Sequence, residues 1–386
     1  TCDGEAIIGL WFNGQRYFGN ILPEQTEKKE HPLFADAKRW LDVYFSGREP
    51  DFLPPLRYDS TPFRRLICEI MLTIPYGKTM TYGQIAAEAA KRLDLRGIPI
   101  FTIDSAETKD IDDAISLQKL DDGYELGVHI ADVSHYVKDG DGIDIDARER
   151  GTSVYFPRRV IPMLPENLSN GICSLNPDVE RLCMVCDMIV TNMGNVKSYE
   201  FYPEVMRSHA RLTYTQVWQW IESGEQHDLK PQIDTLYKLY QKLLAKRQQR
   251  GAMEFDSIET QMIFNDNGKI DRIEPVVRNE AHRLIEECML AANVCAAEFL
   301  LQHKHPALYR NHLGPTPEKL AVLREQLGLL GLHLGGGDKP TPKDYAELAA
   351  QFKERPDQEL LQVMLLRSMQ QAVYEPGNLG HFGLAY

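Results

Sequence analysis

Four aspartates within a span of ten residues form the strongest chemical signal in the sequence. The segment IDSAETKDIDDA contains them, between apolar residues on both sides: Asp104, Asp110, Asp112 and Asp113. Carboxylates held close together repel one another and lose hydration energy when they are buried. A divalent cation removes that cost, and magnesium prefers hard oxygen ligands. The cluster therefore predicts a magnesium site that could clamp a phosphodiester. The alternative is an acidic loop in solvent, which needs no metal.

The elements around the cluster predict an α/β unit from Asp94 to Tyr386. Apolar runs bounded by turn residues predict strands at Pro99–Ile103, Tyr124–Ile130, Leu182–Thr191 and Val196–Tyr202. From Thr213 onward, helical spacing dominates. The predicted helices include Arg278–Gln302, one that opens at Thr316-Pro317, and Asp357–Tyr374.

Residues 1–93 form a different piece of the chain. Within residues 1–55, alternation around Asn13-Gly14 predicts a hairpin, and an apolar stripe predicts a helix from Phe34 to Phe45. Within residues 60–93, Thr61-Pro62 opens a predicted helix that ends near Thr73, and a second helix follows Thr81.

Composition limits the class of protein and its surroundings. The chain has 386 residues and a net charge of −13, which argues against broad basic coverage of nucleic acid but not against a metal-dependent nuclease. No apolar run approaches the roughly 20 residues of a membrane span, and no secretory signal is visible. Seven scattered cysteines suggest no disulfide framework. These features predict a cytoplasmic protein without a membrane partner.

From Asp94 to Tyr386 the chain resembles the catalytic domain of the ribonuclease II / ribonuclease R (RNB) family. The segments that carry the resemblance occur in the family's order: DLRGIPIFTIDSAETKDIDDAIS, ELGVHIADVSHYV, ERGTSVYFPRRVIPMLPENLSNGICSLNP, RNEAHRLIEECMLAANVCAAEF and GHFGLA. The resemblance implies a mixed sheet with helices. It also implies a magnesium-dependent enzyme that degrades single-stranded RNA from the 3′ end and releases nucleoside 5′-monophosphates.

The resemblance also implies roles for individual residues. It places the catalytic metal ligands at the four aspartates and a base-stacking clamp at Tyr155 and Phe255. From the residues alone, both aromatics would be interpreted as core. Two positions stay open. Glu287 either supports the site or pairs with Arg283 one turn earlier. The role of Tyr214 is uncertain in a similar way.

The sequence departs from the family pattern in two respects. The family continues past GHFGLA into a segment of the pattern TSPIRRYPDL, whose arginine contacts the scissile phosphate, and this chain ends at Tyr386. The flanking OB-type RNA-binding domains are not present in it either. We therefore expect a C-terminally truncated catalytic domain with impaired activity.

Residues 1–93 resemble a second family, the alkylguanine-DNA alkyltransferases. The segments are GLWFNGQRYFG, DFLPPL and TPFRRLICEIMLTIPYGKTMTYGQIAAEAA, the last being part of that family's helix-turn-helix. The Pro-Cys-His-Arg motif with the family's nucleophile does not occur. We therefore interpret the chain as a chimera of a small α/β alkyltransferase-like fragment and an incomplete RNB domain. The alternatives to an exoribonuclease are a DNA-lesion-binding or alkyltransferase-related protein acting through residues 1–93, and an inactive chimera.

Overall fold

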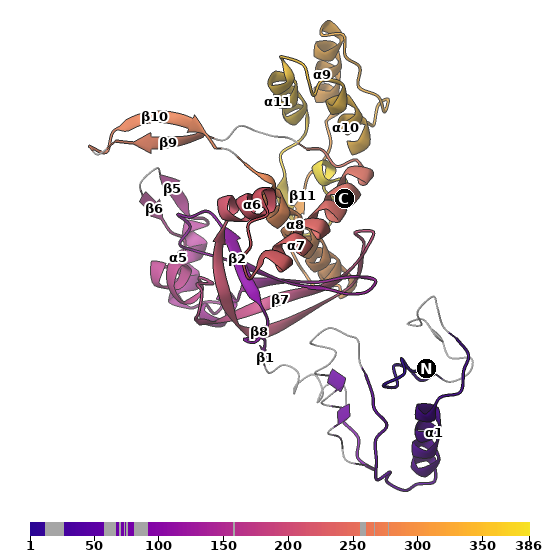
Figure 1. The fold of residues 1–386 in the computed structure, drawn as a ribbon. Coiled ribbons are helices and arrows are strands. Elements are labelled where there is room, and N and C mark those ends of the chain that lie inside the picture. Colours follow the sequence, from indigo (N-terminus) through magenta and orange to yellow (C-terminus); the bar gives the residue numbers. More distant parts are fainter. Residues whose placement is uncertain are drawn as a thin grey trace. The chain divides into compact units, whose positions relative to one another are not determined.

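The computed structural model describes most of the chain. The described residues are 1–11, 27–57, 67–68, 71–72, 74, 76–80, 92–156, 159–254, 260–265, 267–276 and 278–386. They fall into two compact units, Thr1–Leu93 and Asp94–Tyr386. Figure 1 draws both, and each is described by itself.

The first unit contains the helix that the sequence predicts. Helix α1 (Pro32–Phe45) begins two residues before the predicted Phe34. His31 caps it by accepting the backbone N–H of Leu33, and Pro32 occupies the first turn, where its missing N–H costs nothing. The predicted hairpin around Asn13-Gly14 and the predicted helix after Thr81 lie outside the described residues. Of the helix predicted from Thr61 to Thr73, residues 67–68 and 71–72 are described, and they are helical.

Six strands form the central sheet, in the order β1, β8, β2, β3, β4, β7. Their bounds are β1 (Leu93–Asp94), β2 (Ile100–Asp104), β3 (Asp113–Lys119), β4 (Gly123–Ala131), β7 (Glu180–Thr191) and β8 (Val196–Thr213). Strands β2 and β8 run parallel, whereas the β2–β3, β3–β4, β4–β7 and β7–β8 pairs run antiparallel. The sheet is therefore mixed, as the resemblance implied. Because β7 also pairs with β8, five of the strands close into a barrel.

The sequence predicted β2, β4 and β7 within a few residues of their observed ends, but it missed one strand of the sheet and misplaced the end of another. Strand β3 was not predicted, and β8 continues to Thr213 instead of ending at Tyr202. The extension of β8 matters because its last residues pair with β2, from Ile100 opposite Ser208 to Asp104 opposite Thr213.

Three helices cover one face of the barrel. They are α6 (Tyr214–Ser223), α7 (Lys230–Arg250) and α8 (Glu280–Gln302), visible above the sheet in Figure 1. Alternate strand residues such as Ile115, Leu126 and Met188 pack with helix residues such as Leu236 and Leu284 in one buried core. The opposite face of each strand points into the barrel, because side chains alternate along a strand.

A second helical group has a core of its own. It comprises α9 (Pro317–Leu329), α10 (Pro342–Gln351) and α11 (Gln358–Ser368), packed around Leu327, Tyr345 and Phe352. Helix α9 opens at Thr316-Pro317, as predicted. The prediction of one helix from Asp357 to Tyr374 was wrong beyond Ser368, because Val373–Glu375 forms strand β12 against β11 (Tyr309–Asn311).

The remaining elements are short. Their bounds are α4 (Val133–Tyr136), α5 (Gly142–Arg150), β5 (Val154–Phe156), β6 (Arg159–Ile161), η1 (Asn167–Ile172), β9 (Thr260–Phe264), β10 (Ile270–Pro275) and η2 (Phe382–Leu384). Strands β5 and β6 form one hairpin, and β9 and β10 form another. Of the helices that the structure describes, none has the length and apolar character that a membrane span requires.

The barrel interior holds a buried polar network. Nδ1 of His129 (β4) lies 2.5 Å from Oε1 of Glu204 (β8), and its Nε2 lies 2.8 Å from Oγ of Ser116 (β3). The ring can therefore donate to Glu204 and accept from Ser116. Gly127 leaves the space for this contact: a Cβ there would lie 2.4 Å from Oγ of Ser116. The network links three strands of the barrel.

Asp187, also inside the barrel, should make stability depend on pH. Tyr202 donates a hydrogen bond to it (2.9 Å), yet burial and then the charge of Glu125 raise its pKa to about 7. The folded state thus keeps a proton that the unfolded state releases above about pH 4. The contribution of Asp187 to the free energy of unfolding is therefore fully present below about pH 4 and is lost as the pH rises through 7. The wild type should lose about 3 kcal/mol of unfolding free energy between pH 5 and 8 through this group, and Asp187→Asn should not.

Urea unfolding of the whole chain at pH 5 and pH 8 measures this effect. The Asp187→Asn variant should show a flatter pH dependence than the wild type. Asp121→Asn is the control, because Asp121 is exposed and its substitution should leave the dependence unchanged. Equal pH dependence in Asp187→Asn and the wild type would contradict the prediction.

Candidate active site

The strands bring the aspartates to one end of the barrel. Asp104 is the last residue of β2, and Asp113 is the first residue of β3. Because β2 and β3 are antiparallel, with Phe101 opposite Ile115, these two ends are adjacent. The loop between them carries Asp110 and Asp112. The cluster is therefore built on strand ends, with only the intervening loop outside the sheet.

Hydrogen bonds from distant segments hold this loop in place. The buried Ser174 donates its hydroxyl to the carbonyl of Lys109 (2.8 Å) and accepts the backbone N–H of Ile111 (3.1 Å). From β8, Arg211 donates to the carbonyl of Ala106 (3.1 Å). These hydrogen bonds to the backbone restrict the loop that carries Asp110 and Asp112.

The carboxylates are close enough to repel one another. Burial, then the charges of Asp104 and Asp112, raise the pKa of Asp113 to about 6. Partial desolvation, then the charges of Asp110 and Asp104, raise the pKa of Asp112. Asp104 accepts hydrogen bonds from the backbone of Ser105 (2.6 Å) and from the hydroxyl of Thr108 (3.0 Å). All four predicted aspartates thus belong to one electrostatic cluster.

The cluster has the ligand groups of a magnesium site, but its side chains do not have the geometry of a metal site. Burial and the neighbouring charges raise the pKa values of Asp112 and Asp113, and a divalent cation would stabilise such a set of hard carboxylate oxygens. Within the described ranges, no three His, Cys, Asp or Glu side chains are arranged closely enough to hold a metal ion. The assignment of the four aspartates as metal ligands therefore stays a prediction.

Tyr155 lies beside the aspartates. It stands on β5 opposite Val160, its side chain is 67% exposed, and its hydroxyl lies 3.5 Å from Oδ2 of Asp110. An exposed ring next to an acidic centre is available for stacking, and its interpretation as a core aromatic does not fit. The other predicted clamp residue, Phe255, lies outside the described residues.

Tyr214, which the sequence left open, is also at this end of the barrel. It begins α6 directly after Thr213, which lies opposite Asp104 in the parallel β2–β8 pair. Burial and the charges of Asp104 and Asp113 raise its pKa to about 12, against the opposing effect of Arg278. The phenol therefore stays protonated at neutral pH and can donate a hydrogen bond.

Glu287 has a partner that the sequence did not indicate. Its carboxylate is buried and lies 2.7 Å from Nη1 of Arg247, on α7. Arg283, the alternative partner suggested by helical spacing, pairs with Glu280 instead (3.0 Å). Burial raises the pKa of Glu287, and the charge of Arg247 opposes that rise.

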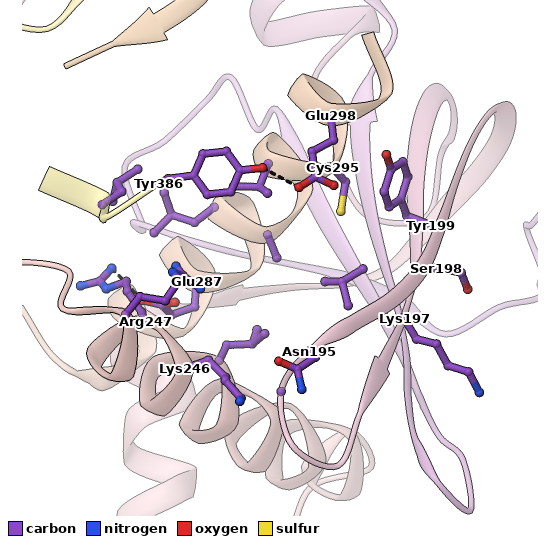
Figure 2. Close-up of a pocket in the computed structure, with 18 residues that line it drawn as sticks. Asn195, Lys197, Ser198, Tyr199, Lys246, Arg247, Glu287, Cys295, Glu298 and Tyr386 are labelled. Atoms are coloured by element: carbon purple, nitrogen blue, oxygen red, sulfur yellow. Dashed lines mark hydrogen bonds and ion pairs between the residues drawn. The ribbon is translucent and has the colours of Figure 1, made fainter. Parts of the chain in front are cut away.

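The Arg247–Glu287 pair borders a pocket of about 420 Å³. Helices α7 and α8, the turn between β7 and β8, and the last residues of the chain line it. Figure 2 shows Arg247 and Glu287 on one side and the hydroxyl of Tyr386 directed at Glu298, to which it donates at 2.6 Å. None of the four aspartates lines this pocket. It is therefore separate from the candidate active site.

The fold and the site together define an α/β domain. It has a closed mixed sheet, three covering helices and an acidic cluster at one end of the barrel. Residues 92–386 match the model of the RNB domain. This match spans most of the chain, and the protein belongs to the RNB family.

Curated relatives agree with this family. The chain is 53% identical to Ribonuclease R of Vibrio cholerae over 300 residues, which is 76% of this chain and 36% of that protein. It is also 53% identical to Ribonuclease R of Escherichia coli over 304 residues, or 77% and 37% of the two chains. The chain thus spans little more than a third of the length of these relatives.

Solved structures have the same fold. RNase R of Mycoplasma genitalium, in complex with ribose-methylated single-stranded RNA, superposes with a TM-score of 0.74 and 30% identity, covering 86% of this chain and 54% of that one. Yeast Ssd1, described as a pseudonuclease, gives a TM-score of 0.61 at 18% identity, covering 78% and 38%. That second likeness concerns the fold alone.

Proposed function

We propose that this chain is a magnesium-dependent exoribonuclease that degrades single-stranded RNA from the 3′ end and releases nucleoside 5′-monophosphates. The observation that carries the proposal is the cluster of repelling aspartates at the barrel end of a chain 53% identical to Ribonuclease R proteins. RNase R of Mycoplasma genitalium has been solved with single-stranded and with double-stranded RNA, which supports RNA as the partner.

The aspartates and Tyr214 would have different roles in the reaction. The predicted magnesium ligands are Asp104, Asp110, Asp112 and Asp113. Bound magnesium would activate the attacking water and offset charge on the phosphate. The protonated hydroxyl of Tyr214 would donate a hydrogen bond to a phosphate oxygen. Water adds to the phosphorus of the last phosphodiester, the bond to the preceding 3′ oxygen breaks, and that oxygen takes a proton.

The clamp would select the end of the strand without reading its sequence. Tyr155 and the predicted partner Phe255 would stack on the terminal bases, and stacking accepts every base because each has a π face. A degradative enzyme needs this tolerance.

The predictions for residues 1–93 stay predictions. The family match begins at residue 92, so the alkyltransferase-like resemblance, DNA as a partner and the chimera interpretation lie outside it.

Digestion of end-labelled RNA tests the proposed function. Single-stranded RNA labelled at the 5′ end should give a ladder that shortens from the 3′ end with magnesium and stays intact with EDTA. RNA labelled at the 3′ end should release labelled mononucleotide first. Internal cleavage, or intact RNA at high protein concentration with magnesium, would count against the proposal.

Replacing Tyr155 with alanine should weaken RNA binding. Loss of one stacked base costs about 1–3 kcal/mol, which corresponds to an increase in Kd of about 5- to 150-fold. Fluorescence anisotropy with labelled single-stranded RNA in EDTA measures binding without turnover. Tyr374→Ala is the matched control, because Tyr374 is 64% exposed but stands on β12, in a separate two-stranded sheet. Equal loss of affinity in both variants would show that Tyr155 has no special role.

A further inference from the structure

Two helices begin side by side next to the aspartates. Thr213 caps α6 and Asn279 caps α8, each within a capping box. The side-chain amide of Asn279 donates to the carbonyl of Tyr214 (3.4 Å). The ring of His282 stacks on the ring of Tyr214, with centroids 4.0 Å apart and planes inclined by 20°. The start of α8 thus contacts Tyr214 at both its backbone and its ring.

The capping box of α8 fixes the orientation of the His282 ring. Nδ1 of His282 lies 3.2 Å from the backbone nitrogen of Asn279 and 2.9 Å from its side-chain Oδ1, and Oδ1 of Asn279 accepts the N–H of Ala281 (3.0 Å). The ring is therefore held by its own helix before it contacts Tyr214.

Without a neighbouring ring, a tyrosine at the first position of a helix can occupy several rotamers. The stacked ring of His282 excludes rotamers that swing the phenol away, and so reduces the cost of ordering it. Thr213 lies opposite Asp104 at the end of the parallel β2–β8 pair, so the backbone places Tyr214 at the acidic cluster. Burial and then the charges of Asp104 and Asp113 raise the pKa of its hydroxyl.

We propose that His282 is a positioning residue that holds the Tyr214 hydroxyl at the aspartate cluster, where the proposed function places the scissile phosphate. His282 acts through Tyr214 and does not touch the RNA. Asn279 supports the same arrangement by holding the backbone of Tyr214.

The chain contains a matched control for this contact. His227 stacks on Trp220 with centroids 4.1 Å apart and planes inclined by 20°. Its Nδ1 accepts the backbone N–H of Leu229 (3.2 Å), at the start of the next helix. His227→Ala therefore removes the same type of stack and hydrogen bond, but from a buried tryptophan that has no part in the proposed reaction.

Kinetics on single-stranded RNA with magnesium give the first test. His282→Ala should lower kcat by about 3- to 10-fold, the equivalent of one aromatic contact, with KM changed less than about twofold. His282→Phe, which keeps the stack, should recover most of the lost kcat. His227→Ala should keep the wild-type kcat. In a Tyr214→Phe background, which lacks the hydroxyl, His282→Ala should cause no further loss, because the two residues act as one unit.

A spectroscopic readout does not depend on turnover. The protein is labelled with 3-fluorotyrosine, and the ¹⁹F signal of Tyr214 is identified by its disappearance in Tyr214→Phe. His282→Ala should shift that signal, whereas His227→Ala should leave it in place. An unmoved signal in His282→Ala would overturn the positioning role, and so would an undiminished loss of kcat in the Tyr214→Phe background. If the wild type does not cleave RNA, the proposed function fails, and the ¹⁹F signal alone decides the role of His282.

Discussion

Replacing Asp113 with asparagine should lower kcat on RNA by about a thousand-fold, the largest effect that we expect from any single substitution. Asparagine has nearly the shape of aspartate but no charge, so it removes one ligand charge without disturbing the start of β3. RNA binding in EDTA should stay within a few-fold of the wild type, because Asp113 is a predicted metal ligand and has no proposed contact with a base. Asp112→Asn should behave in the same way.

The same substitution should make the metal-free protein more stable. The pKa of Asp113 is raised to about 6, so the folded state disfavours the ionised carboxylate that is present at pH 7. Asparagine removes that penalty, and the melting temperature in EDTA should rise above that of the wild type. Loss of turnover together with a gain in stability is the signature of residues held in an unfavourable arrangement for function.

Asp122→Asn is the control for both measurements. Asp122 lies in the turn between β3 and β4, at the other end of the strand that begins with Asp113, and pairs only loosely with Lys197 (3.6 Å). Its substitution should change neither kcat nor the melting temperature. Wild-type turnover in Asp113→Asn would remove the aspartate cluster from the mechanism, and a lowered melting temperature would show that the carboxylate has a structural role.

The chemistry of the site was visible in the sequence because it is local. The four aspartates lie in one short segment, so their types and spacing indicated mutual repulsion without any knowledge of the fold. Tyr214 was ambiguous for the opposite reason. It reaches the cluster only because β8 runs parallel to β2 and ends opposite Asp104, and β8 was predicted to end at Tyr202.

Long-range partners were the main limit in the prediction of the site. Helical spacing suggested Arg283 as the partner of Glu287, since residues four apart share a helix face. The observed partner, Arg247, comes from another helix, and packing of α7 on α8 places it there. His129 contacts Glu204, 75 residues away, and nothing local in the sequence indicates this pair.

The missed strand β3 and the early end predicted for β8 have different physical causes. In β3 the inward side chains are small or polar, such as Ala114 and Ser116, so the apolar pattern is short. In β8 the residue after Tyr202 is Pro203, which normally indicates an edge or an end of a strand. It pairs with Met184 within the β7–β8 ladder, and the strand continues.

Removing one partner of the His129–Glu204 pair should destabilise the protein by about 3–5 kcal/mol, because the remaining group is buried without compensation. Both side chains are almost fully buried, and they join β4 to β8 across the barrel. His129→Leu and Glu204→Leu should each lower the urea midpoint by the corresponding amount. Since β4 and β8 both lead to the aspartate end, turnover on RNA should fall with stability.

The double variant His129→Leu/Glu204→Leu should be more stable than either single variant, because two apolar side chains leave no buried charge. The coupling energy of the double-mutant cycle measures this recovery directly. Asp139→Asn serves as the control, since the Asp139–Arg148 pair is exposed and its loss should not move the midpoint. Additive losses in the double variant would mean that the two side chains contribute independently. In that case the barrel would be held by packing, and the network would be incidental to it.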